Sequence, residues 1–495
     1  MSLRVILRIL GLLLMLFSLT MLPPMLMSLW FRDGVWHAFM SGIGITVMTG
    51  LLLYLPNRRA HKELRIRDGF IIAAMFWTVL ALFGSLPLML FGEDALSMTD
   101  AVFESFSGLT TTGATVITGI DFLPESILYY RQQLQWLGGM GIVVLAVAIL
   151  PTLGVGGMAL YRTEIPGPLK DSKLTPRITE TAKALWYIYA TLTFACTVAY
   201  MLAGMNWFDA LGHSFSTVAI GGFSTYDASI GYFDSAAIEL ICVAFMLISA
   251  FSFSLHFIAW REKRLLHYFQ DPEARFLMLF LAGLTTITVV TLWLTDTYES
   301  ITGLRHALFE VVSVATTAGF AVADFSGWPG ALPFLLFVAA FVGGCSGSTA
   351  GGMKVIRIIL ILKQGMREVM RLIHPNAVIA VKVGKVSVPD SIAQAVWGFF
   401  SAYVMLFFLM LVGVMATGVD QVTAWSTVGS ALNNLGPALG EASSHYGDLP
   451  SLAKWILVLA MLLGRLEIFY GTGAVYPPPF GGVKHTASDL FIETF

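Results

Sequence analysis

Charged residues are scarce in this sequence. Asp, Glu, Lys and Arg make up 12% of the 495 residues and hydrophobic residues 57%, whereas about 25% of an ordinary soluble domain is charged. Apolar runs of about 20 residues, the length that crosses the hydrocarbon core of a bilayer, recur from one end of the chain to the other. The short alternating segments of a membrane β-barrel are missing. The sequence therefore predicts an all-α polytopic membrane protein.

Cysteine and catalytic motifs are scarce as well. The three cysteines, Cys196, Cys242 and Cys345, lie in apolar or glycine-rich stretches without a CxxC pair, so they predict neither a disulfide framework nor a metal centre. No GxGxxG follows a predicted strand, and no Ser/His/Asp set or HxxxH spacing is discernible. We therefore expect no enzyme, no cofactor in this chain and no nucleic-acid partner.

Positive charge is concentrated in five places. These are Arg4 with Arg8, and the segments 57–68, 158–183, 261–275 and 354–386. Short loops rich in Lys and Arg face the cytoplasm, so the N-terminus and these four segments are predicted to be cytoplasmic. Anionic lipid would bind the same loops.

The first apolar run resembles a signal peptide, but it continues past Pro23 and Pro24 to about Trp30 without a convincing cleavage site. We expect a retained first helix. The segments between the basic loops carry Glu93, Asp94 and other acids. They predict an acidic outer face that would concentrate cations, although exclusion of positive charge from outer loops explains the same pattern.

Four short semi-apolar segments repeat one pattern between the longer apolar runs. They read "DAVFESFSGLTTTGAT" (100–115), "DALGHSFSTVAIGGFS" (209–224), "HALFEVVSVATTAGFA" (306–321) and "TAWSTVGSALNNLGPA" (423–438). Aligned on Gly113, Gly222, Gly319 and Gly436, all four have Ser six residues before the glycine and Ala twelve residues before it. Such segments are too short to span a bilayer and predict re-entrant helices.

The turns after these helices leave helical geometry at membrane depth, where such backbone must be buried in protein or line water. Four turns around one axis would present rings of carbonyl oxygens that replace the hydration shell of a potassium-sized cation. Glycine permits positive φ and close approach of the backbone. Turns that only cap buried hairpins are the alternative, but four copies in register favour a pore.

A further stretch, "GGCSGSTAGGMK" (343–354), interrupts an apolar run and is called the gate loop below. It is not a phosphate-binding loop, because Met353 separates Gly352 from Lys354. Together with "TTTGAT", "VAIGGFST", "VATTAGFA" and "NNLGPA", it resembles the TrkH-type subunits of the Trk/Ktr/HKT superfamily of potassium transporters. The resemblance covers roughly residues 1–470.

The resemblance implies two extra N-terminal helices followed by four helix–pore loop–helix repeats in pseudo-fourfold arrangement. Apolar runs near 3–31 and 39–56 fit the first two helices. The corresponding divisions of the chain are 1–68 for the N-terminal helices, 69–157, 158–260, 261–365 and 366–472 for the repeats, and 473–495 for a C-terminal tail.

The function implied by the resemblance is potassium uptake across the bacterial inner (plasma) membrane, through a channel-like pore. The expected partners are a second copy of the chain and a cytoplasmic nucleotide-binding (TrkA-like) subunit that gates it, together with membrane lipids. The alternative is a sodium-permeable or ion-coupled monovalent-cation symporter. Inverted-repeat transporters fit less well, because these four repeats keep one polarity.

The resemblance also assigns a selectivity filter that binds K⁺. Its residues are Thr111, Thr112, Gly113, Ile220, Gly221, Gly222, Thr317, Ala318, Gly319, Asn434, Leu435 and Gly436. Glycine at all four aligned positions favours potassium. In this superfamily a serine in place of the first filter glycine, here Gly113, is associated with sodium permeation. Asn433, Asn434 and Pro437 make the fourth segment irregular and predict coarser selection.

The implied gate is the loop below the filter. Its residues are Gly343, Gly344, Cys345, Ser346, Gly347, Ser348, Thr349, Ala350, Gly351, Gly352 and Lys354. So many glycines make a weak helix, although a packed interface of small residues also favours glycine. Lys354 would add an electrostatic barrier or extend to the cytoplasmic surface.

Three other ionisable residues stand out. Arg465 lies within an apolar segment, where insertion costs about 2.5–3.5 kcal/mol. By resemblance it faces the pore below the filter; the alternative is a buried ion pair, for which Glu467 is nearest in sequence but faces away on a helix. Glu104 and Glu310 occupy one column of the repeat and either hold the filter from behind or line a solvated outer mouth.

Overall fold

The computed structural model describes residues 3–60, 66–92, 95–141, 178–377, 379–384 and 386–466. Glu467, the tail at 473–495, Glu93, Asp94 and most of segment 158–183 lie outside these residues. The described elements are helices apart from one antiparallel hairpin of β1 (Lys382–Val383) and β2 (Val386–Ser387).

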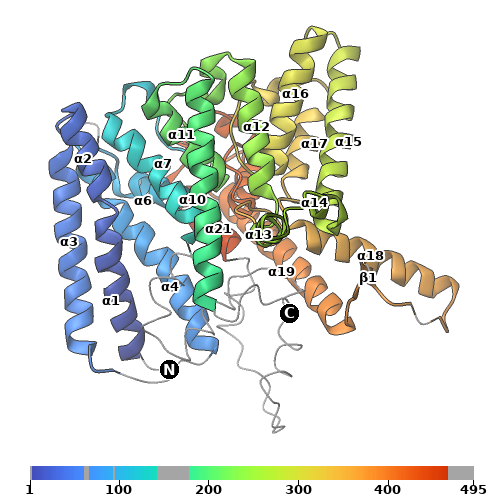
Figure 1. Ribbon diagram of the computed structural model, residues 1–495, viewed down its shortest axis with the longest axis horizontal. Coiled ribbons are helices and arrows are strands. Elements are labelled where there is room, and N and C mark those ends of the chain that lie inside the picture. Colours follow the sequence, from blue (N-terminus) through green and yellow to red (C-terminus); the bar gives the residue numbers. More distant parts are fainter. Residues whose placement is uncertain are drawn as a thin grey trace.

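The two expected N-terminal helices form a hairpin at one edge of the molecule (Figure 1). It comprises α1 (Leu3–Leu19), α2 (Leu22–Phe31), α3 (Trp36–Tyr54) and the 3-10 helix η1 (Leu55–Asn57). Pro23 and Pro24 start α2, because proline is tolerated only in the first turn of a helix. Gly11 and Gly50 let α1 and α3 approach closely: a Cβ on Gly11 would lie 2.6 Å from the Gly50 oxygen. The hairpin packs on α4 and α7 of the next unit.

Four units of similar order follow. Their first helices are α4 (Ile66–Gly84), α10 (Ile178–Leu202), α15 (Pro272–Leu294) and α19 (Asp390–Met415). Their short inner helices, called pore helices below, are α6 (Met98–Leu109), α11 (Trp207–Ala219), α16 (Ser300–Ala315) and α20 (Gln421–Asn433).

The second helices of the units are shorter or broken. They are α7 (Glu125–Gly139), α12 (Ala236–Ala250) with α13 (Phe253–Glu262), α17 (Leu332–Ala339) with α18 (Val355–Ile373), and α21 (Ser451–Arg465). The connections contain α5 (Leu86–Leu90), α14 (Leu266–Gln270) and the 3-10 helices η2 (Ile120–Phe122), η4 (Ser229–Phe233), η5 (Phe325–Gly327) and η6 (Gly440–Ala442). Each of these four 3-10 helices lies between a pore helix and the second helix of its unit.

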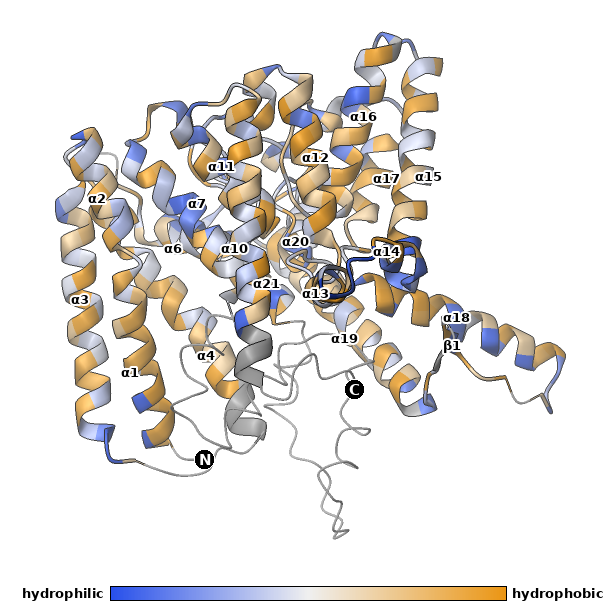
Figure 2. Cartoon of the chain, viewed as in Figure 1, coloured by the Kyte–Doolittle hydropathy of each residue, from blue (hydrophilic) through white to orange (hydrophobic). Residues whose placement is uncertain are grey.

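Six segments among the described residues are long and apolar enough to cross a membrane. They are Leu3–Phe31, Trp36–Asn57, Ile71–Leu90, Lys183–Leu202, Pro272–Leu294 and Ile392–Met415, and α12 with α13 makes a seventh if that bent pair is one span. Hydrophobic residues dominate α1, α3 and α4, whereas hydrophilic residues gather at α13 and α14 (Figure 2). Apart from the β1–β2 hairpin, the described part of the chain therefore has the architecture of a helical, multi-span membrane protein.

The sequence predicts a second spanning helix in each repeat, interrupted by the gate loop in the third. The structure breaks this helix in the second repeat as well, which was not predicted from the sequence. The axes of α12 and α13 differ by 94° across Phe251 and Ser252. Serines in this stretch (Ser249, Ser252, Ser254) compete for backbone hydrogen bonds and so weaken a helix. In the third unit the helix stops at Ala339 and the gate loop intervenes before α18, as the glycine density predicts.

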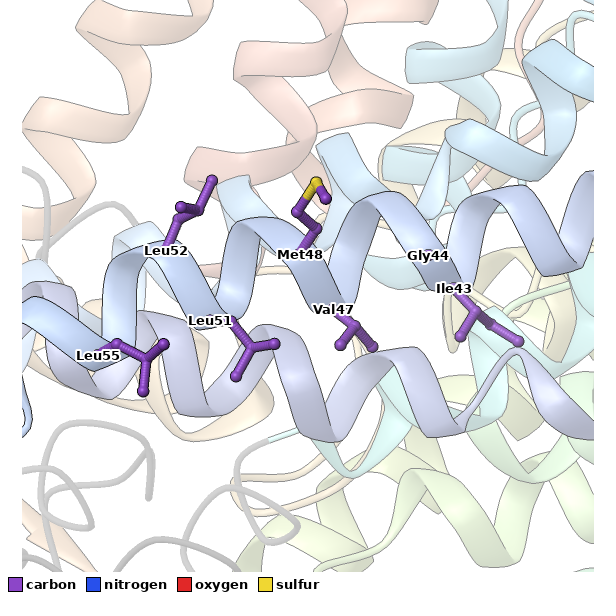
Figure 3. A pocket seen from close by; sticks show the side chains of 7 residues that line it. All are labelled: Ile43, Gly44, Val47, Met48, Leu51, Leu52 and Leu55. Carbon is purple, nitrogen blue, oxygen red and sulfur yellow. The ribbon is translucent and has the colours of Figure 1, made fainter.

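One groove on the surface of α3 is wholly apolar. Figure 3 shows its lining side chains, Ile43, Gly44, Val47, Met48, Leu51, Leu52 and Leu55. None of these side chains carries an oxygen or nitrogen, so the groove offers no side-chain ligand for an ion.

Candidate functional site

The N-termini of the pore helices are fixed by local caps in three units. Ser97 accepts a hydrogen bond from the Asp100 N–H (3.2 Å), Asn206 from the Asp209 N–H (2.8 Å) and Asp420 from the Val422 N–H (2.9 Å). Hydrogen bonds from Thr423 and Val422 lower the pKa of Asp420 below its ordinary value. These caps satisfy backbone donors that a helix start leaves unpaired.

The backbone after each pore helix has the same unusual conformation in all four units. The residue two before each aligned glycine is left-handed: φ is 56° at Thr111, 54° at Ile220, 66° at Thr317 and 51° at Asn434. The aligned glycines follow with φ of 80°, 82°, 80° and 98°. Positive φ is rare for a β-branched residue, so its occurrence at three equivalent positions marks a strongly constrained segment.

A repeated hydrogen bond holds this conformation. The backbone oxygen of the shared serine accepts the N–H of the residue before the glycine. The four donors are Thr112 (2.8 Å), Gly221 (2.8 Å), Ala318 (2.8 Å) and Leu435 (2.9 Å). The predicted register of the four segments therefore corresponds to one backbone structure repeated four times.

The four segments close into a ring. A Cβ added to Gly113 would collide with the Gly221 oxygen, and one on Gly222 with the Ala318 oxygen. The same holds around the rest of the ring, for Gly319 against the Leu435 oxygen and Gly436 against the Thr112 oxygen. Each repeat thus places a carbonyl oxygen against the glycine of its neighbour. Only glycine leaves room for this approach while keeping positive φ.

Buried carboxylates hold the chain just outside this ring. Glu104 and Glu310 are 0% exposed. Glu104 accepts hydrogen bonds from the Val116 N–H (3.0 Å) and from Arg131 (2.8 Å). Glu310 accepts them from the Val322 and Ala323 N–H groups (2.8 and 3.0 Å). Both carboxylates are therefore buried behind the ring and bonded to the chain that follows it, and neither lines a solvated mouth.

In the other two units, different side chains hold the chain that follows the ring. His213, in the same column as these carboxylates, bonds the Ser224 hydroxyl at 2.8 Å. In the fourth unit Ser426, one position from that column, accepts the Leu439 N–H at 2.9 Å. The role is therefore shared by all four units although the residue type is not.

Sequence reasoning missed the polar face of α7. Gln135 donates to the Gly221 oxygen (2.6 Å) and accepts the Phe223 N–H (3.0 Å), and Gln132 donates to the Phe223 oxygen (3.3 Å). The Arg131 guanidinium lies 4.3 Å from the centre of the Phe223 ring. The signal was present in "YYRQQLQ" (129–135), because ionisable and amide residues within a membrane-depth helix are costly and usually functional.

The gate loop lies against the inner ends of the pore helices and the filter. Gly351 N–H donates to the Thr317 hydroxyl (2.7 Å), and Gly352 N–H to the Asn433 oxygen (3.0 Å). The Thr349 hydroxyl donates to the Val218 oxygen, one residue before the end of α11, at 2.9 Å. The loop therefore contacts the second, third and fourth units directly.

Arg465 connects the gate loop to the first unit, so that the loop is linked to all four units. It donates to the Thr111 hydroxyl (3.1 Å), to the Gly138 oxygen (2.6 Å) and to the Thr349 oxygen (3.4 Å). Its guanidinium also lies 5.3 Å from the centre of the Trp77 ring. The charge at the end of α21 is thus placed between Thr111, two residues before the first ring glycine, and Thr349 of the gate loop.

Lys354 does not extend to the cytoplasmic surface. Its side chain is 5% exposed, and its ammonium donates to the Ala350 oxygen within the gate loop. Lys354 has φ of 73°, and positive φ also occurs at Gly343, Gly347 and Gly352. The loop is therefore an irregular, compact segment with a buried cation at its C-terminal end.

The irregular fourth segment keeps the shared backbone but adds side-chain bonds. The Asn434 amide donates to the Thr112 hydroxyl (3.0 Å) and to the Met461 oxygen (3.0 Å). The Tyr446 hydroxyl donates to the Gly436 oxygen (2.7 Å). The fourth repeat therefore differs from the others in its side chains rather than in its chain path.

Comparisons with known proteins agree with this geometry. A family model named TrkH and described as a cation transport protein matches residues 36–471. The Trk system potassium uptake protein TrkH of Halomonas elongata is 87% identical over 469 residues, which cover 95% of this chain and 97% of that protein.

More distant relatives match over the same length. The Trk system potassium uptake protein TrkG of Escherichia coli K12 is 41% identical over 468 residues, covering 94% of this chain and 96% of that protein. The crystal structure of the potassium transporter TrkH from Vibrio parahaemolyticus superposes with a TM-score of 0.88 at 52% identity, covering 96% of this chain and 99% of that one.

Proposed function

The chain belongs to the TrkH family of cation transport proteins, and we propose that it is the membrane subunit of a potassium uptake system. Potassium passes through one pore at the axis of four repeats. The relatives at 87% and 41% identity are both named as Trk system potassium uptake proteins. The chain carries out transport and is not an enzyme.

The closed ring of four glycines and four carbonyl oxygens is the observation that carries this proposal. Each oxygen comes from the residue before an aligned glycine: Thr112, Gly221, Ala318 and Leu435. Backbone oxygens placed in this way can replace the water around a potassium ion. The residues behind the ring hold it through hydrogen bonds, among them Glu104, which is paired with Arg131, and Gln135.

The gate loop is the second part of the proposal. In this conformation it is bonded beneath the filter through Thr349, Gly351 and Gly352. Its four positive-φ positions allow other conformations at low cost, because three of them are glycines. Conduction then requires the loop to move, and Arg465 lowers cation occupancy beneath the filter as long as its charge stays there.

Weaker ion selection is the one alternative with a specific observation behind it. The Asn434 amide donates hydrogen bonds to the Thr112 hydroxyl and the Met461 oxygen. One repeat of the ring therefore differs from the other three. A sodium-permeable pathway or an ion-coupled symporter would share this feature. Glycine at all four positions favours potassium as the main ion.

The proposal includes the setting of the pore. The basic segments and the N-terminus face the cytoplasm of a bacterial inner membrane, where the exposed Arg261, Lys263 and Arg264 contact lipid or a nucleotide-binding regulatory subunit. The chain acts as a homodimer. Its units are 1–68, the repeats 69–157, 158–260, 261–365 and 366–472, and the tail 473–495.

Complementation tests this function in cells. The chain is expressed in a bacterial strain that lacks its own potassium uptake proteins but retains the cytoplasmic nucleotide-binding subunit. We expect growth at low external potassium, and no growth with Gly319→Ala at equal membrane expression. Growth that is no better than that of the empty strain, with the chain present in the membrane, would contradict the proposal.

A further inference from the structure

The tip of the gate loop is held by elements other than the filter. Three consecutive residues each make one backbone bond. Cys345 N–H donates to the Ala250 oxygen (2.9 Å), Ser346 N–H to the Glu273 carboxylate (2.7 Å), and the Gly347 oxygen accepts the Phe253 N–H (3.0 Å). The loop is therefore fixed on two sides, by the filter through residues 349–352 and by this second set through 345–347.

All three anchors belong to one stretch of chain, which begins with Ala250, the last residue of α12. Phe253 is the first residue of α13, Glu273 lies in the first turn of α15, and α14 lies between them. Hydrophilic residues gather over α13 and α14 (Figure 2). This stretch therefore supplies all three bonds to residues 345–347 of the gate loop.

Glu273 is the one side chain in this set of three bonds. It is half-buried, and its helix start is fixed by Asp271, which accepts the Ala274 N–H at 2.8 Å. Its carboxylate oxygen pairs with the Ser346 N–H, a backbone donor that is costly to leave unpaired inside a protein. The other two anchors are backbone groups, so Glu273 is the anchor that a side-chain substitution removes without altering the backbone.

We propose that Glu273 is a positioning residue that holds the tip of the gate loop beneath the filter and so keeps the pore closed. Loss of its carboxylate leaves the Ser346 N–H unpaired and frees a segment whose glycines give it little conformational preference of its own. The loop then leaves the blocking position more often. This inference rests on the proposed function, because it takes residues 343–354 to be the gate.

The test uses the cysteine next to the anchored residue as a reporter. Cys345 is 1% exposed, and the chain has only two other cysteines, Cys196 and Cys242, which are replaced by alanine. The whole chain is reconstituted in proteoliposomes as wild type, Glu273→Ala and Glu273→Gln. Glu262→Gln is the matched control, since it neutralises an exposed carboxylate on α13.

Two readouts are taken: the rate at which a maleimide modifies Cys345, and potassium flux with its ratio to sodium flux. Glu273→Ala should raise the modification rate at least about tenfold, the change in an equilibrium that accompanies the loss of one hydrogen bond that leaves a buried donor unpaired. Potassium flux should rise with it, in the native-cysteine chain as well, while the potassium-to-sodium ratio stays unchanged. Glu273→Gln should lie between, because its amide oxygen still accepts a bond, and Glu262→Gln should match the wild type.

The outcomes separate this proposal from the proposed gate. A Glu273→Ala chain that is modified and conducts like the wild type would overturn the role of Glu273, as would a changed ion ratio. If that variant does not fold, the same results with Glu273→Gln decide. A chain lacking residues 345–351 serves as the reference. If this deletion raises potassium flux while the Glu273 variants behave like the wild type, the loop is the gate but Glu273 does not hold it. Unchanged flux after the deletion would contradict the gate itself.

Discussion

At the scale of single residues, Gly222 shows why the ring requires glycine. Its φ is 82°, and an added Cβ would collide with the Ala318 oxygen of the next repeat. Both the backbone conformation and the space exclude other residues. The same two constraints apply at each of the four aligned glycines, so the ring tolerates no methyl group at any of them.

Gly222→Ala should abolish most potassium transport. The left-handed conformation alone costs alanine about 1–2 kcal/mol, before the collision with Ala318 is counted, so we expect flux to fall at least about tenfold. Rubidium uptake into proteoliposomes measures it. Gly283→Ala is the control, because Gly283 lies within α15 and a Cβ there meets no atom within 4 Å. Equal uptake by both variants would show that the ring is not the ion pathway.

Glu104 and Arg131 form a fully buried ion pair with a 2.8 Å contact and exposures of 0% and 1%. Glu104→Gln leaves Arg131 without a counter-charge, and breaking a buried pair in this way costs about 3–5 kcal/mol. We therefore expect a clear drop in the thermal midpoint of the purified chain. Glu299→Gln, at an exposed carboxylate, should leave the midpoint unchanged. A stable Glu104→Gln chain would mean that water or a cation reaches this site.

At the scale of elements, the pore helices and their register were predictable from sequence, whereas their supports were not. The alignment on Gly113 and its equivalents worked because glycine is needed wherever backbone meets backbone at positive φ. The bend between α12 and α13 depends on tertiary contacts, since Phe253 N–H finds its partner in Gly347, far along the chain. No local pattern shows such a bond in advance.

The gate loop was predictable as an interruption, but its contacts were not. Glycine density in 343–352 indicates a broken helix. That Thr349, Gly351 and Arg465 would meet elements of all four repeats depends on how the units pack. The polar face of α7 is visible in "YYRQQLQ" (129–135), but the partners of these side chains on the second repeat depend on packing.

α18 is the element that extends away from the rest of the chain (Figure 1). Arg367, on this helix, bonds Asp390 at the start of α19. The Arg367 hydrogen bond and charge lower the pKa of Asp390 below its ordinary value of 3.8. A lowered pKa stabilises the folded arrangement at pH values above the ordinary pKa, and this contribution is lost as the pH falls through the lowered value.

Asp390→Asn should therefore loosen the packing of α18 at neutral pH. The wild type should show the same loosening only when the pH falls below about 4, as the carboxylate takes up a proton. The rate of amide hydrogen exchange in the 355–373 segment measures how firmly α18 is packed. Asp296→Asn, at an exposed carboxylate beyond the far end of α15, should leave exchange unchanged. Identical exchange in Asp390→Asn and wild type would show that the ion pair does not hold α18.

At the scale of the whole molecule, the four repeats meet at one ring and one loop. The ring joins each repeat to its neighbours through backbone atoms, and the gate loop, with Arg465, makes contact with all four units. The N-terminal hairpin holds the first unit from outside: Asp33 accepts the Ser126 N–H at the start of α7 (3.0 Å). The ring is therefore held by contacts from all four repeats, and the N-terminal hairpin adds one from outside.

The most direct test of the account is ion flux through the purified chain. Proteoliposomes that contain it alone are given an imposed gradient, and uptake of potassium, rubidium and sodium is compared, with Gly222→Ala as the control. The account predicts potassium and rubidium uptake well above sodium uptake, and potassium and rubidium uptake at least about tenfold lower in the control. Equal uptake of sodium would contradict a potassium filter and would mean that the irregular fourth repeat at Asn434 sets a general pathway for monovalent cations.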